Sequence, residues 1–151
     1  MIRALALACI AAWLGIVAFF SFAVAPLVFR TVDRAAAGLA VSAVLPHYYR
    51  WGVILTAVAL VAYLVAAARE ARGRLTAGVA AALCAAMVAT LAWAWLVVLP
   101  SAEAARRAGG DTAFAHAHRL AVQLNGFTLL TGVADRLRVL LELTGHAADP
   151  A

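Results

Sequence analysis

An uncharged run of 28 residues, from Leu75 to Ala102, constrains this chain more than any other feature. About 20 apolar residues in a helix, rising 1.5 Å each, cross the hydrocarbon core of a bilayer. A soluble domain of this length has too little core to bury such a segment on every side. The run therefore predicts a protein that folds in lipid.

A second uncharged run, of 26 residues, separates Arg3 from Arg30. The apolar region of a signal peptide is about 7–15 residues long, so we expect this run to be a retained spanning helix. Only 13% of the chain is charged, against roughly 25% in soluble domains. All 12 basic residues are arginine, and they stand near the ends of apolar runs, where arginines contact lipid headgroups. We therefore expect the chain to contact the lipid bilayer and not to bind nucleic acid.

The charge pattern predicts an all-α fold: an integral membrane four-helix bundle in one domain, residues 1–151. We expect spans at about 5–29, 46–68, 76–99 and 113–140, with a short helix or kinked segment between the first two. That segment, residues 31–45, is either an interfacial helix or the first part of span two, which Pro46 would kink. Gly38 and Ser42 have the small-xxx-small spacing that favours close helix approach.

Span three contains no polar group suited to chemistry and is expected to face lipid. Cys9 and Cys84 lie inside apolar runs and are expected to be small core residues. Arginines divide evenly between the two sides of a four-span topology, but the basic turn from Arg69 to Arg74 is the most concentrated. Because short basic loops favour the cytoplasm, we expect cytoplasmic termini and a bacterial inner membrane.

Polar residues gather where spans one, two and four are expected to end on one membrane face. Ionisable residues in a membrane commonly mark a functional site. The predicted polar pocket comprises Arg30, His47, Tyr48, Tyr49, Arg50, His116, His118, Arg119 and Asn125. Within it, His118 and Asn125 share one helix face, being seven residues apart.

Three roles are open for this pocket. Neutral imidazole binds copper or haem iron, and His118, His47 and His116 are the candidate ligands. One role is copper binding or transport; another is a b-type haem protein, with His118 as axial ligand. The third is a structural or accessory subunit, in a homo-oligomer or a larger membrane complex. No catalytic residue is predicted, because no nucleophile–base set or phosphate-binding loop is present, and a non-enzymatic role is favoured.

Several short motifs occur in the order found in the transmembrane protein 205-like family, a membrane family of unknown function. They are FSFAVAPLVFR at Phe20–Arg30, Pro46 with Tyr48, and His118-Arg119-Leu120 with Asn125. The chain resembles this family over about residues 13–133, with matching positions Pro26, Phe29, Gly38, Pro46, Tyr48, His118 and Asn125. Leu45 and Ala121 depart from the family pattern. The resemblance implies a four-helix membrane bundle, distantly similar to copper-resistance-D-type domains and to the haem-containing protoporphyrinogen oxidase bundle, and it implies no established reaction.

Overall fold

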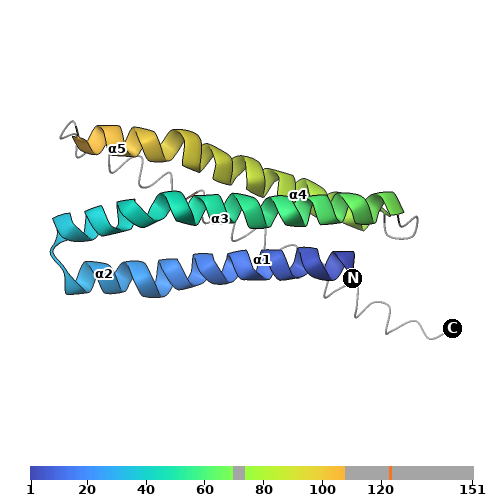
Figure 1. Cartoon of the computed structure of the whole chain (residues 1–151), viewed down its shortest axis with the longest axis horizontal. Helices are drawn as coiled ribbons and strands as arrows, with labels where there is room; N and C mark the ends of the chain where they lie inside the picture. Colours follow the sequence, from blue (N-terminus) through green and yellow to red (C-terminus); the bar gives the residue numbers. More distant parts are fainter. Residues whose placement is uncertain (70–73, 108–122, 124–151) are drawn as a thin grey trace.

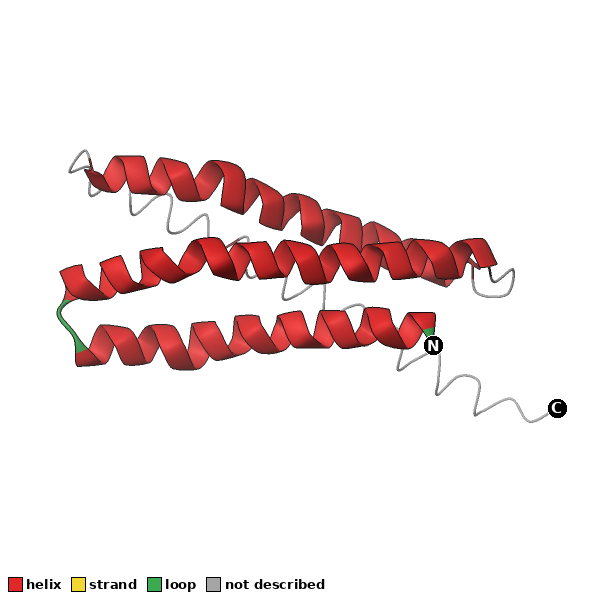
Figure 2. Ribbon diagram, in the orientation of Figure 1, coloured by secondary structure: helices red, strands yellow, loops and turns green. Residues whose placement is uncertain are grey.

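The computed structural model describes residues 1–69, 74–107 and 123, and the described elements are all helical (Figure 2). The first helical segment runs without a break through α1 (Ile2–Phe19), the π-helical turn η1 (Phe20–Val24) and α2 (Ala25–Thr31). After a short loop, α3 covers Arg34–Arg69. The third segment comprises α4 (Arg74–Trp93), the π-helical turn η2 (Ala94–Val98) and α5 (Leu99–Arg107). The predicted fourth span, residues 113–140, lies outside the described residues except for residue 123.

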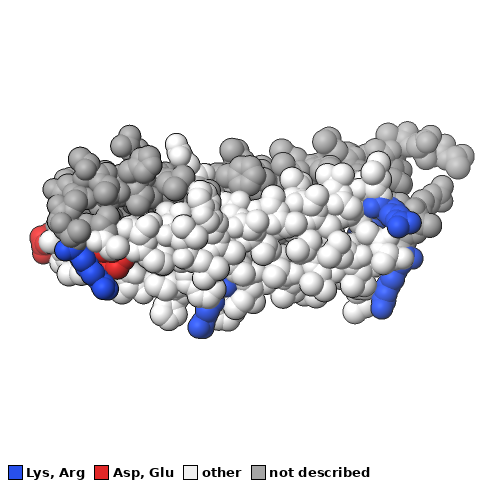
Figure 3. Space-filling model, turned by 90° about the horizontal axis from the view of Figure 1, so that it is seen from above, with Lys and Arg blue, Asp and Glu red and all other residues white. Residues whose placement is uncertain are grey.

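Three of these helical segments are long and apolar enough to cross a membrane: Ile2–Thr31, Ala35–Arg69 and Arg74–Ala104. At 1.5 Å per residue they measure about 45, 52 and 46 Å, more than the roughly 30 Å of a hydrocarbon core. Large apolar side chains such as Phe22 and Leu27 are exposed along them, as lipid-facing residues are. Figure 3 shows charged side chains at both ends of one face, with some basic atoms between the two ends. The protein is therefore an all-helical integral membrane protein, as its sequence predicts.

The helix α3 lies between α1 and α4 (Figure 1), and no Cα atom of α1 comes within 8 Å of one of α4. On α1 the buried residues recur every three or four positions and form one stripe: Ala6, Ile10, Trp13 and Val17. A matching stripe on α4 includes Cys84, Met87 and Leu91. Span three, which was expected to face lipid, therefore also supplies packing surface, because one side of it packs into the core.

Residues 34–45 belong to the same helix as span two, since α3 continues through Pro46. Of the two alternatives for this segment, the interfacial helix is excluded. Asp33 caps α3: its Oδ1 accepts hydrogen bonds from the backbone N–H groups of Ala35 and Ala36, at 3.1 and 3.0 Å. The close helix approach expected at Gly38 does not occur among the described residues, because a Cβ built there meets nothing within 4 Å.

Each π-helical turn precedes a proline by the same number of residues. η1 begins six residues before Pro26, and η2 begins six residues before Pro100. Proline has no N–H and its ring collides with the carbonyl four residues earlier, so a wider turn relieves the collision. The hydrogen bond from Ala25 N–H to Phe20 O, five residues back, shows this widening directly.

Candidate functional site

Trp13 of α1 packs closely against Gly52 of α3. A Cβ atom built at Gly52 would lie 2.6 Å from Trp13 Cη2, and two further ring carbons would be within 2.9 Å. The indole therefore lies against bare helix backbone. The carbonyl of Gly52 accepts a 2.7 Å hydrogen bond from Thr56 Oγ1, one turn further along α3. Glycine at this position fixes how closely the two helices pack.

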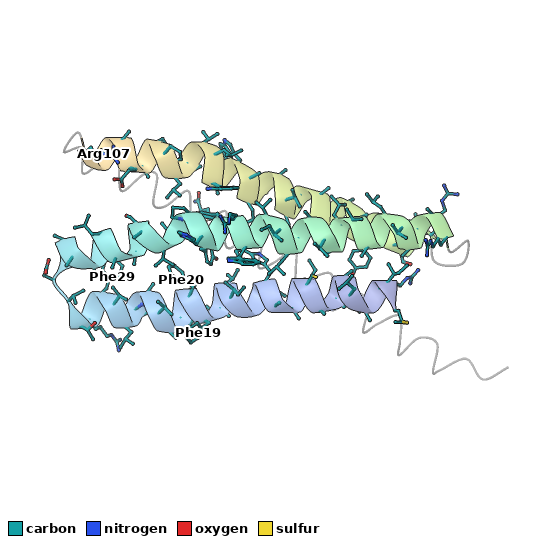
Figure 4. The ribbon with its side chains drawn as sticks, in the orientation of Figure 1. Phe19, Phe20, Phe29 and Arg107 are labelled. Carbon is teal, nitrogen blue, oxygen red and sulfur yellow. The ribbon has the colours of Figure 1, made fainter. Side chains whose placement is uncertain are left out.

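The ring of Tyr48 packs against three other aromatic rings. Its ring centroid is 4.9 Å from that of Trp13, 5.1 Å from Phe20 and 5.2 Å from Tyr49. Figure 4 shows Phe20 on the side of the first helix that faces α3, and Phe19 on the opposite side. Tilted and edge-on ring pairs at these separations stabilise the contact beyond the area they bury. We call Trp13, Phe20, Tyr48 and Tyr49 the aromatic cluster.

Two polar atoms of this cluster are buried without a partner. Trp13 Nε1 and Tyr48 Oη are both inaccessible to solvent, and neither has a hydrogen-bond partner among the described residues. Burying a polar group without a partner costs about 1–3 kcal/mol in protein mutational data. Unpartnered groups of this kind are rare in native proteins, so each requires a physical explanation.

The aromatic cluster lies near the middle of the first apolar run. Trp13 is ten residues beyond Arg3, and Phe20 is ten residues before Arg30. Tyr48 contacts both rings and is therefore level with a point about 20 Å from each charged end. Tyr48 and Tyr49 were expected at one membrane face together with Arg30. The structure does not bring the tyrosines beside Arg30, because α3 begins immediately after the loop and Tyr48 is already four turns into it.

His47 and Arg50 point away from the aromatic cluster. Tyr48 and Tyr49 are buried, whereas His47 and Arg50 are exposed on the outward side of α3. They are three residues apart and therefore share one helix face. Trp51 and Ile54 extend this face and are 51% and 42% exposed. We call His47, Arg50, Trp51 and Ile54 the outward face of α3.

The structure thus divides the polar pocket expected from the sequence. It brings Tyr48 and Tyr49 together but places His47 and Arg50 on another side of α3, and Arg30 is exposed near the end of α2. Within residues 1–69 and 74–107, no group of three His, Cys, Asp or Glu side chains is arranged to hold a metal ion. The remaining pocket candidates lie outside the described residues: His116, His118, Arg119 and Asn125.

Sequence reasoning missed Trp13, Phe20 and Gly52. In a membrane protein a tryptophan usually lies at the membrane interface or packs in the core. Neither role predicts which residue of another helix contacts its indole ring. The available signal was the combination of a glycine and a tyrosine one turn apart on α3, Gly52 and Tyr48. That spacing provides a gap in which a large ring from another helix fits.

Comparison with known proteins places these features in context. A family model described as "Domain of unknown function (DUF4149)" matches residues 8–111, a segment that includes the aromatic cluster and ends before His116. An uncharacterized protein of Aquifex aeolicus is 45% identical over 56 residues, which is 37% of this chain and 42% of that protein. The chain thus spans less than half the length of this relative. No solved structure matches the chain.

Proposed function

We propose that this chain, which belongs to the DUF4149 family of unknown function, is a membrane subunit that binds an acidic partner helix through the outward face of α3. The observation that supports this role is the position of Arg50. It stands two residues beyond Tyr48, about 3 Å along the helix axis, and is exposed. A charged side chain facing outward at that depth is costly in hydrocarbon unless an opposite charge meets it.

The described part of the chain offers no counter-charge to Arg50. Its two carboxylates, Asp33 and Glu103, are both engaged near helix ends. Asp33 caps α3, and Glu103 Oε1 lies 3.3 Å from Arg107 Nε. No hydrogen bond or ion pair among the described residues reaches Arg50.

Lipid phosphates are an unsuitable partner because of depth. Arginine can extend toward a headgroup, or snorkel, when it lies near the end of a span. Here both charged ends of the first apolar run are more than about 15 Å away, beyond the reach of the side chain. The apolar surface also continues past this level in both directions, with Phe22 exposed on one side and Leu5 on the other.

A second copy of the same face is also unsuitable. In a twofold dimer the same patch meets itself, so two copies of His47 and Arg50 would stand opposite each other. Like charges in an apolar interface disfavour that arrangement. A different helix, carrying an aspartate or glutamate at matching depth, would pair with the guanidinium and cover Trp51 and Ile54.

The copper and haem roles of His118, His47 and His116 stay predictions. Of these ligands His47 alone is described, and it lies on the outward face of α3 rather than beside the aromatic cluster. A metal held there would need donors from outside the described residues. The accessory-subunit role is the alternative that the position of Arg50 favours.

We expect Arg50→Gln to release the protein from its complex. Membranes from the native host, solubilised in a mild detergent, are resolved on a native gel with a tagged chain. The wild type is expected to migrate with a partner, and Arg50→Gln as the chain alone, because the desolvated ion pair contributes about 2–5 kcal/mol, or at least tenfold in affinity.

Arg69→Gln is the matched control, because Arg69 ends α3 beside the turn and should leave the complex intact. Thermal unfolding in detergent checks that Arg50→Gln remains folded. A wild-type chain that migrates alone, or an Arg50→Gln variant that migrates with the complex, would contradict the proposed function.

A further inference from the structure

We infer that Trp13 and Tyr48 bind an uncharged molecule through an oxygen atom that accepts a hydrogen bond, between α1 and α3 near the middle of the membrane. This site is distinct from the outward face of α3. The oxygen comes from one of two sources: a water molecule, or the carbonyl group of a membrane-soluble compound. Either source offers an oxygen atom that can accept hydrogen bonds from the Trp13 indole N–H and the Tyr48 hydroxyl.

The two side chains supply matching chemistry. The indole N–H of Trp13 only donates, and the hydroxyl of Tyr48 both donates and accepts. Trp13 is 0% exposed and Tyr48 is 5% exposed, and their rings are in contact at 4.9 Å. Neither polar atom has a partner among the described residues. An oxygen acceptor between them would satisfy both donors, as buried waters commonly do for such groups.

The first helical segment is irregular beside the aromatic cluster, at the π-helical turn η1 that contains Phe20. No Cα atom of η1 lies within 8 Å of one of α3, although α1 and α2 on either side of it approach α3 more closely. In η1 the N–H of Ala25 bonds to Phe20 O, and Pro26 has no N–H to donate to the next carbonyl. One backbone carbonyl of this segment therefore lacks the hydrogen bond that a residue other than proline would donate.

The bound molecule should be uncharged because, among residues 1–69 and 74–107, no charged side chain pairs with Trp13 Nε1 or Tyr48 Oη. The nearest ionisable side chains in sequence, His47 and Arg50, are exposed on the outward side of α3. An ion buried among Trp13, Phe20 and Tyr48 would lack a counter-charge at a large desolvation cost. A neutral acceptor needs only the two hydrogen bonds that are available.

The test is nuclear magnetic resonance of the full chain in detergent, with ¹⁵N in the indole groups. The chain has four tryptophans, so Trp51, Trp93 and Trp95 serve as internal controls. We expect the Trp13 N–H to show a hydrogen-bonded proton shift and a cross-peak either to water or to a non-protein proton. Tyr48→Phe, which keeps the ring and removes the hydroxyl, should abolish or strongly reduce that cross-peak.

The two sources are distinguished in the same sample. Water gives a cross-peak at the water frequency, and no compound is then released when the purified protein is extracted with organic solvent. A membrane-soluble compound gives a cross-peak at its own frequency, and mass spectrometry finds it in the extract. Cross-peaks from Trp13 N–H to protein protons alone, in the wild type, would overturn the inference; so would an unchanged cross-peak in Tyr48→Phe.

Discussion

Replacing Gly52 by alanine is expected to destabilise the protein by about 2 kcal/mol, within the usual range for overpacking a close contact. The added methyl would lie 2.6 Å from Trp13 Cη2, a separation that forces the indole or the helix to move. The indole cannot move freely, because its ring already contacts Tyr48 on another side. The measurement is the midpoint of reversible unfolding in mixed micelles of detergent and denaturing surfactant.

Two other glycines make the matched controls for Gly52→Ala. A Cβ built at Gly15 on α1 or at Gly78 on α4 meets nothing within 4 Å. Because alanine favours a helix over glycine by up to about 1 kcal/mol, Gly15→Ala and Gly78→Ala should be neutral or slightly stabilising. A loss of stability at Gly52, against no loss at the two controls, would test the contact between Gly52 and Trp13. Equal effects at all three positions would contradict the close packing of Trp13 on Gly52.

Replacing Trp13 by alanine is also expected to lower the free energy of unfolding substantially. In soluble proteins a buried Trp→Ala substitution costs about 3–5 kcal/mol, through lost transfer energy and an unfilled cavity. In lipid the transfer term is small, because hydrocarbon is as apolar as the core. We therefore expect a loss of about 2–3 kcal/mol, from the cavity and from the ring contacts with Tyr48 and Gly52.

Trp93→Ala is the control for Trp13→Ala, because Trp93 is 47% exposed and lipid can fill the space that its indole leaves. Its cost in the same unfolding assay should be below about 1 kcal/mol, as for surface positions generally. Trp13→Ala should also relieve the collision in Gly52→Ala, so the double variant should be more stable than the sum of the single losses. Additive losses would show that the two residues do not touch.

The membrane-spanning helices could be predicted because charge is excluded from hydrocarbon. The uncharged runs after Arg3 and after Arg74 correspond to the first and third helical segments. The ends of α3 were harder to place, because residues 31–45 contain Asp33 and Arg34 as well as small residues. Asp33 turned out to cap the helix, a role that depends on where the chain turns.

The inward face of α3 could not be predicted from its residues. In a soluble helix, apolar residues mark the buried face, but in lipid both faces are apolar. Tyr48 and His47 are neighbours in sequence, and nothing in composition says that Tyr48 is buried and His47 exposed. The depth of Tyr48 in the membrane could not be predicted either, because α3 is longer than the bilayer core. Its level along the first helical segment is set by its contacts with Trp13 and Phe20.

The aromatic cluster and the outward face of α3 therefore arise from one packing arrangement. Once Trp13 lies on Gly52, helix geometry puts Tyr48 toward α1 and Arg50 away from it. The close contact of Trp13 with Gly52 thus fixes the outward direction of Arg50. The proposed partner binding requires the Arg50 side chain to face outward, so it can be tested by substitutions at residue 50.

The most direct test uses the absence of lysine from this chain. Arg50→Lys introduces a side-chain amine that a membrane-permeable carbodiimide can join to a carboxylate in contact with it, with Arg69→Lys as the control at the helix end. In native membranes we expect an adduct in which residue 50 is linked to an aspartate or glutamate inside an apolar segment of another protein. Absence of an adduct at residue 50, or linkage to a lipid carboxylate, would contradict it.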